Sequence, residues 1–458
     1  MYRVFLSWRY MRARRTNVIG IIGICVGVGA LILILSIMSG FLAETRKAVR
    51  GSLADIVIMP INVPRPGGVA VPYDPAPLLA VVRADPRVAA ASAQLHWFGY
   101  ITRDEGRFDT SLANLNMSDP ERGALGGVRL AGVDVQDEFA TTELRAALQR
   151  TSGFGGSPVA DVNDPFAPPP GYEPEGRPLA SILVGEQQAA LAHLTRGSIV
   201  NVFTGVPDPV ADELRTSNRR YVVAGTFRSG ENDTDLQVVY LERSELMDLL
   251  GPPREFSNVL VKLHDYEHDG EAVVADLRAK LYEAGLIRER GVTEVRTWEE
   301  FRNVLLGAIE NEKVLMTIML SLVVVVAGFT VFAILSMMVT EKRRDIGILS
   351  ALGATPGGIH FLFLLIGFWD ALLGATLGAI LGTIGALKID GIERWLSKTF
   401  HVQIFNRDVY LFDHIPSVVD PVAVALIVLG AFLCTLVFAS IPAWKAGRMH
   451  PLDALRYE

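Results

Sequence analysis

The sequence predicts a membrane protein of four transmembrane α-helices, with a large mixed α/β domain inserted between helices 1 and 2. Four apolar runs are long enough to cross a bilayer, which takes about 20 residues of helix. Because backbone groups in lipid must form their hydrogen bonds within the segment, each run is expected to be a helix. A long polar stretch with strand-like and helix-like patterns separates the first two runs. The predicted spans are residues 18–43, 313–340, 359–387 and 421–444.

Lysine and arginine are concentrated on one side of these spans. Three segments, residues 1–17, 341–358 and 445–458, together hold 11 bases and four acids, whereas residues 44–313 hold 28 bases and 40 acids. Segments rich in Lys and Arg stay in the cytoplasm. We therefore expect both termini to be cytoplasmic and residues 44–312 and 388–420 to be exported. The first run is too long for a cleaved signal peptide and lacks a clear small-x-small exit, which favours an uncleaved anchor.

The exported part alternates two kinds of pattern, as in an α/β or α+β fold. Strands are expected at 54–59, 198–203, 221–227 and 236–241, and helices at 75–85 and 271–286. Residues 298–312 are expected to form a helix that continues unbroken into the second span. Both cysteines, Cys25 and Cys434, fall inside spans, so this domain has no disulfide.

Two stretches of the exported part are predicted to be loops. Ser157–Pro178 holds seven prolines and few residues that could fill a core, which predicts a mobile surface insertion. Val206–Asn218 lies between two predicted strands and is longer than a tight hairpin needs. Each is either a solvated loop or a projection that binds a partner.

The chain lacks the motifs of the common catalytic and cofactor sites. No glycine-rich loop ends in Lys-Ser/Thr, so ATP, if it is used, must be bound by another subunit. No HExxH or CxxC pattern indicates a metal site, and no serine stands in a G-x-S-x-G context. We expect no catalytic residues, no cofactor and no nucleic-acid partner.

The segment between spans two and three, VTEKRRDIGILSALGATP (339–356), is a candidate contact site for a partner protein. Its five consecutive charges exclude it from hydrocarbon. Ile346, Leu349 and Leu352 recur every three residues and predict an apolar stripe on a short helix, which Thr340 would cap and Gly353 and Pro356 would end. A docking role is favoured over a purely topological one. The candidate coupling residues are Glu341, Lys342, Arg343, Arg344, Asp345, Ile346, Gly347, Leu349, Leu352 and Gly353.

The third span carries two further features. Gly374, Gly378 and Gly382 recur every four residues, which lets another helix approach closely, either within this chain or from a second transmembrane subunit. Asp370 is a carboxyl group inside a predicted span, where it either faces protein or water or lies near the interface because the span starts later.

These residues resemble a known family. The connector TEKRRDIGILSALGATP, the glycine-rich span after it and the ending PAWKAGRMHPLDALRYE (442–458) resemble the permeases that include FtsX, MacB and the lipoprotein-releasing subunits LolC and LolE. The opening WRYMR (8–12) and LSIMSGF (35–41) are similar to the LolC/LolE subgroup, as are LAGVDVQDE (130–138) and VVAGTF (222–227). The Pro-rich insertion departs from that pattern.

The resemblance implies a multi-pass protein of the bacterial inner membrane that works in an ABC transporter complex. A separate ATPase dimer would dock on residues 341–354 and move the periplasmic domains, with a second permease subunit, identical or different, beside this chain. In the lipoprotein-releasing branch, the cargo is an acylated protein taken from the membrane lipid, and a periplasmic carrier is held by a hairpin loop, here 206–218. Alternatives within the family are MacB-like efflux and FtsX-like regulation of a periplasmic hydrolase. The residues of spans one and two that would line the lipid-facing cavity are Ile24, Leu31, Met38, Leu320 and Phe329.

Overall fold

The computed structural model describes residues 2–12, 15–60, 74–103, 126–150, 156–172, 178–207, 214–251, 255–287, 294–400 and 414–449. The chain divides into two compact units. A helical unit comprises residues 1–44, 305–406 and 413–458, and an α/β unit comprises residues 45–304 and 407–412.

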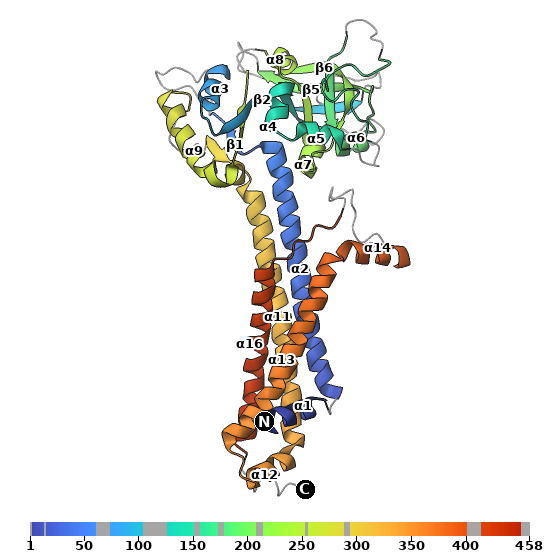
Figure 1. Ribbon diagram of the computed structural model, residues 1–458. Helices are drawn as coiled ribbons and strands as arrows, with labels where there is room; N and C mark the ends of the chain where they lie inside the picture. Colours follow the sequence, from blue (N-terminus) through green and yellow to red (C-terminus); the bar gives the residue numbers. More distant parts are fainter. Residues whose placement is uncertain are drawn as a thin grey trace. The chain divides into compact units, whose positions relative to one another are not determined.

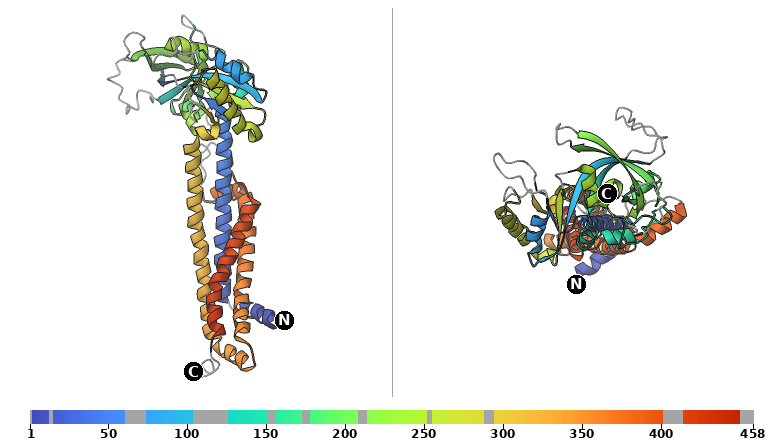
Figure 2. Two further views of the ribbon diagram at one scale, coloured as in Figure 1. Left: turned by 90° about the vertical axis from the view of Figure 1, so that its left-hand side faces the viewer. Right: turned by 90° about the horizontal axis from the view of Figure 1, so that it is seen from above.

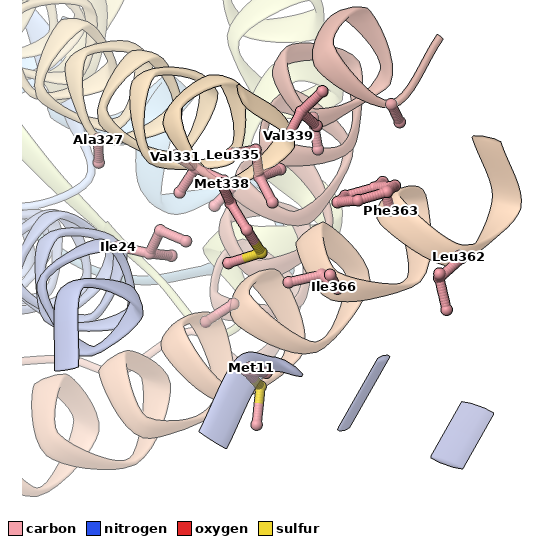
Figure 3. Close-up of a cluster of buried hydrophobic side chains, with 14 of the residues drawn as sticks. Met11, Ile24, Ala327, Val331, Leu335, Met338, Val339, Leu362, Phe363 and Ile366 are labelled. Atoms are coloured by element: carbon pink, nitrogen blue, oxygen red, sulfur yellow. The ribbon is translucent and has the colours of Figure 1, made fainter. Parts of the chain in front are cut away.

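Four long helices form the helical unit, as the four apolar runs predicted. They are α2 (Arg15–Leu53), α11 (Asn303–Glu341), α13 (Pro356–Leu387) and α16 (Pro421–Gly447), each long and apolar enough to cross a membrane. The parts of these helices within the unit run side by side (Figures 1 and 2). Their buried side chains, among them Ile24, Leu335 and Ile366, form one cluster (Figure 3). The described residues of this unit also form three shorter helices: α1 (Tyr2–Arg12), α12 (Arg343–Ala351) and α14 (Ile389–Phe400).

Local sequence signals explain where two of these helices begin. Pro356 is the first residue of α13, and the Thr355 hydroxyl accepts a hydrogen bond from the Gly358 N–H at 3.2 Å. Pro421 opens α16 in the same way after Asp420, whose carboxylate accepts from the Val422 N–H at 2.9 Å. Proline is tolerated there because the first N–H groups of a helix have no partner within it.

The α/β unit is built on a mixed sheet, in agreement with the mixed α/β domain that the sequence predicts. In the described residues, nine strands lie in the order β3-β7-β4-β6-β5-β2-β8-β1-β9, with β3 also paired to β2. The strands are β1 (Ile56–Ile58), β2 (Val88–Arg103), β3 (Gly126–Val133), β4 (Ser181–Gly185), β5 (Ile199–Pro207), β6 (Leu214–Phe227), β7 (Val238–Glu242), β8 (Asn258–Leu263) and β9 (Val295–Thr297). The helices are α3 (Ala76–Arg83), α4 (Val135–Thr141), α5 (Leu144–Gln149), α6 (Glu186–Leu191), α7 (Asn232–Gln237), α8 (Arg243–Leu250), α9 (Tyr266–Glu283) and α10 (Trp298–Phe301).

The long strand β2 joins two lobes of this unit. Up to Gln94, which pairs with Asn258, β2 lies against β8 in the lobe of β1, β9, α3 and α9. From Leu95, which pairs with Gly132, it lies against β3 in the lobe of β4 to β7. Each lobe has its own buried cluster.

The helix expected over 298–312 is not continuous. α10 ends at Phe301, Arg302 has φ −104° and ψ 22°, and α11 begins at Asn303. Thr297 and Glu300 form a reciprocal N-terminal cap on α10, which fixes its start as a separate turn. The break is held by an ion pair of 2.8 Å between Arg302 and Glu231.

Both predicted loops prove more ordered than expected. Val159 and Phe166 of the Pro-rich insertion are buried against Phe227 and Tyr240, so the expectation of a mobile surface insertion is wrong for residues 156–172. A Cβ at Gly225 would lie 2.8 Å from the Val159 nitrogen. Because glycine has no Cβ, Gly225 leaves room for the insertion at Val159.

The 206–218 segment is largely strand rather than loop. β5 and β6 pair in register from Ile199↔Val222 to Pro207↔Leu214 and form a long antiparallel hairpin. Residues 208–213 lie outside the described residues.

Candidate functional site

The corner between α11 and α13 forms the predicted short helix, α12, at one end of the helical unit (Figure 1). One residue, Lys342, separates α12 from α11. Thr340 does not cap α12, because α11 runs on to Glu341 and the Thr340 hydroxyl donates to the Ser336 carbonyl at 3.0 Å. Gly353 ends the corner with φ +90°, a conformation that strains other residues.

The predicted apolar stripe on α12 is divided between core and surface. Ile346 is 1 % exposed within the cluster of the helical unit, and Leu349 is half-buried, but Leu352 is 79 % exposed. A helix turns about 100° per residue, so a three-residue spacing drifts by about 60° at each step and leaves the buried face. The exposed apolar pair is instead Ile348, 45 % exposed, and Leu352, which lie one turn apart on the same face.

The first helix of the chain contacts this corner through polar groups. Asp345 accepts from the Lys342 ammonium at 2.8 Å and from the Tyr10 hydroxyl of α1 at 3.3 Å. The Lys342 ammonium lies 5.2 Å from the centre of the Tyr10 ring. Burial, followed by the nearby Asp345 carboxylate, raises the pKa of Tyr10. Tyr10 is not among the predicted coupling residues, although an aromatic residue in a basic segment before a span is a recognisable interface signal.

Apolar contacts also place α1 against α13. The Trp8 and Trp369 rings meet edge to face, with centroids 5.2 Å apart, and Met11 is buried in the main cluster. Of the other coupling residues, Gly347 is buried, Arg343 is half-buried, and Glu341 and Arg344 are exposed at the surface of the corner. Within the described ranges, no three His, Cys, Asp or Glu side chains gather closely enough to hold a metal ion.

The glycine series of α13 contacts α2 of the same chain. A Cβ at Gly374 would lie 2.7 Å from the Ile24 Cβ. One at Gly378 would lie 2.7 Å from the Cys25 carbonyl oxygen, and one at Gly382 would lie 2.8 Å from that of Gly29. The three contacts advance together along both helices, so the small residues allow α2 and α13 to pack backbone to backbone.

Asp370 faces the protein interior rather than the membrane interface. It is 1 % exposed, and its Oδ1 accepts no hydrogen bond from the described residues. One turn before the Gly374 contact, the same register brings Asp370 to the level of Asn17 on α2. Asn17 is also buried, and its Oδ1 likewise has no hydrogen-bond partner in the described part of the chain.

The residues assigned to a lipid-facing cavity are only partly placed as expected. Ile24 and Leu31 are buried among the helices of this chain, so a lipid-lining role for these two is wrong. Met38 and Leu320 are half-buried, and Phe329 is 58 % exposed.

Comparison with known proteins matches both parts of the architecture. The MacB-like periplasmic core domain family matches residues 18–280, and the FtsX-like permease C-terminal family matches residues 317–451. The chain belongs to the FtsX-like permeases with a MacB-like periplasmic core domain.

The chain is similar to permeases along its whole length. It is 27 % identical to the lipoprotein-releasing system transmembrane protein LolC of Xylella fastidiosa, over 99 % of this chain and 98 % of that protein. It is 26 % identical to LolC of Neisseria meningitidis serogroup B, over 99 % of each chain. It is also 26 % identical to the macrolide export ATP-binding/permease protein MacB of Campylobacter jejuni, over 50 % of this chain and 33 % of that protein. As a permease of this family, the chain is a multi-pass protein of the inner membrane.

Proposed function

We propose that this permease couples ATP hydrolysis by a separate subunit to the release of lipoproteins from the inner membrane. The observation that carries the proposal is the similarity to LolC proteins over 99 % of the chain, the α/β unit included. An ABC complex of this kind holds two permease subunits and an ATPase dimer. Both termini and α12 are cytoplasmic in this proposal, and the α/β unit is periplasmic, in line with the Lys and Arg bias of the flanks.

The ATPase docks on α12 through Ile348 and Leu352. Two features support this contact: both side chains are apolar and exposed, and the corner around them is basic at Arg344. Ile346 anchors α12 in the helical core, and one residue separates α12 from α11. Because packed cores shift between discrete arrangements rather than deform gradually, a force on α12 displaces α11 and α13.

Within the α/β unit, buried polar contacts hold two segments to the sheet: the one that follows α2 and the one that precedes α11. Asp55, directly after α2, is fully buried and accepts from the Arg50 Nε at 2.7 Å and the Leu263 N–H at 2.9 Å. Its own carbonyl accepts from the Trp298 N–H at the start of α10, at 3.1 Å. Arg302 binds Glu231, in the other lobe. Motion of α2 and α11 is thereby passed to both lobes.

The cargo is an acylated protein, and the exposed apolar side of α11 suits its acyl chains. That side carries Leu315, Ile318, Leu322 and Phe329, each 58 to 63 % exposed. The β5–β6 hairpin is the element that holds a periplasmic carrier, since its two strands pair over a long stretch, from Ile199↔Val222 to Pro207↔Leu214.

Depletion of the permease in its host tests the proposal. Acylated proteins destined for the outer membrane should accumulate in the inner membrane, as measured by fractionation and labelling of lipoproteins. A wild-type copy should restore sorting. Normal sorting with increased drug sensitivity would indicate MacB-like efflux, and normal sorting with unseparated cells would indicate FtsX-like regulation. Either result would refute lipoprotein release.

A further inference from the structure

The helix α14 has two distinct faces. It follows α13 after a single residue, Lys388, at the end of α13 opposite α12. At about 100° per residue, its apolar side chains occupy an arc of about 140°, and its charged side chains lie outside that arc. The apolar positions are Ile389, Ile392, Trp395, Leu396 and Phe400.

α14 exposes large apolar side chains while two of its acidic side chains are buried or half-buried. Trp395 is 63 % exposed and Phe400 64 %, whereas Glu393 is 9 % exposed and receives the Ser397 hydroxyl at 2.8 Å. Asp390, beside it on the polar face, accepts from the Ile415 N–H at 2.8 Å. A surface helix in water buries its apolar face and exposes its polar one. The surroundings of α14 are therefore apolar on its outer side.

Continuity with a membrane span identifies these surroundings. Near its end α13 exposes an apolar surface of Leu377, Ile380, Leu381, Ile384 and Leu387, which belongs to a candidate span. Figure 1 shows α14 turning away from the axis of α13 at this point. An exposed apolar surface thus ends on α13 at Leu387 and resumes on α14, with the single residue Lys388 between the two helices. Trp at the water boundary, with Lys and Arg nearby, is typical of residues at the headgroup level.

We propose that α14 lies in the bilayer surface on the exported side, where α13 ends, with Ile392, Trp395 and Phe400 in the upper acyl layer. The partner is phospholipid rather than protein. The proposed function adds that this leaflet is the one from which lipoproteins leave, so α14 places apolar side chains at the depth of their acyl chains. That last step rests on the proposed function, but the lipid contact does not.

Site-directed spin labelling of the full-length protein tests the contact. The native cysteines, Cys25 and Cys434, are first replaced by alanine. Trp395→Cys and the matched control Arg394→Cys, on the opposite face, are labelled in nanodiscs of phosphatidylethanolamine and phosphatidylglycerol. Both side chains are exposed, so neither change removes a buried contact. Accessibility of each label to oxygen, which concentrates in lipid, is compared with that to a water-soluble nickel chelate.

The label at Trp395 should favour oxygen over the nickel chelate by at least threefold relative to the label at Arg394. Single labels along 389–400 should repeat this ratio with the period of a helix. Equal nickel access at both positions would place α14 in water and overturn the proposal. Shielding of the Trp395 label from both reagents, or spin–spin broadening between copies, would show a protein partner and overturn it too. Because no ATPase or cargo takes part, the outcome is independent of lipoprotein release.

Discussion

Truncation of the exposed apolar pair on α12 should weaken the binding of the ATPase subunit without unfolding the permease. The change is the double substitution Ile348→Ala/Leu352→Ala. Each truncation removes three carbon atoms, and a buried methylene is worth about 0.8 kcal/mol. Only the exposed fractions of these side chains, 45 % and 79 %, can be covered by a partner. Weighted by these fractions, the lost binding free energy is about 3 kcal/mol. That loss corresponds to a Kd raised about 150-fold.

Biolayer interferometry on nanodisc-embedded permease with the purified ATPase subunit measures this change, and stimulated ATPase activity provides a second readout. Leu191→Ala is the matched control, because Leu191 is 66 % exposed but lies in the α/β unit. It should leave the Kd unchanged. Ile346→Ala is a second control that separates folding from docking: Ile346 is 1 % exposed, so its truncation should lower stability, by about 2–4 kcal/mol. A Kd that rises less than threefold in the double variant would refute docking through this pair.

Three further predictions concern stability, measured by chemical denaturation of the full chain in detergent. Gly378→Leu should lower the free energy of unfolding by about 1–3 kcal/mol or abolish folding, since its Cβ would lie 2.7 Å from the Cys25 carbonyl oxygen. Gly430→Leu is the control and should leave stability unchanged, because Gly430 has open space around it. Equal effects of the two substitutions would argue against tight packing of α2 on α13. Asp55→Ala should cost about 3 kcal/mol, the lower end for a broken buried pair because Arg50 is 32 % exposed. The exposed pair Arg83–Asp137 provides the control, because Asp137→Ala should lower stability by under about 1 kcal/mol. An equally small loss of stability for Asp55→Ala would contradict the anchoring role of Asp55. Burial raises the pKa of Asp235 to about 6 from 3.8, so the folded state holds its proton more tightly than the unfolded state, and stability should fall by about 2 kcal/mol as pH rises from 4 to 6. Asp235→Asn should flatten that dependence, and an unchanged pH profile would exclude Asp235 as its source.

Long apolar runs determine the spans from sequence, because a helix is the stable form of a backbone in lipid, whatever its neighbours. The sequence also predicts the strand around Tyr221. It predicts a contact face on α13 as well, because the glycines of that helix recur every four residues. The sequence could not show that α2 is the partner of that face, since a missing side chain specifies a close approach but not which helix approaches.

Local sequence patterns fail to predict structure where burial depends on distant segments. The Pro-rich insertion has few apolar residues, yet two of them, Val159 and Phe166, are buried on the sheet, and Gly225 leaves room for Val159. The sequence predicts a helix that continues past Arg302, but the ion pair with Glu231 holds a break there. Neither Glu231 nor Gly225 is near its partner in sequence, so no local pattern could reveal the contact.

The connector, residues 339–356, shows most clearly what the sequence determines and what the tertiary structure decides. Its sequence alone determined that a charged, then apolar segment lies outside the membrane between two spans and forms a short helix. Tertiary structure decided which of its apolar residues remain available to a partner: Ile346 is buried in the helical core, and Ile348 and Leu352 are exposed. The physical reason is that helical periodicity gives the relative angles of side chains, whereas the direction of the whole helix is set by the helices packed against it.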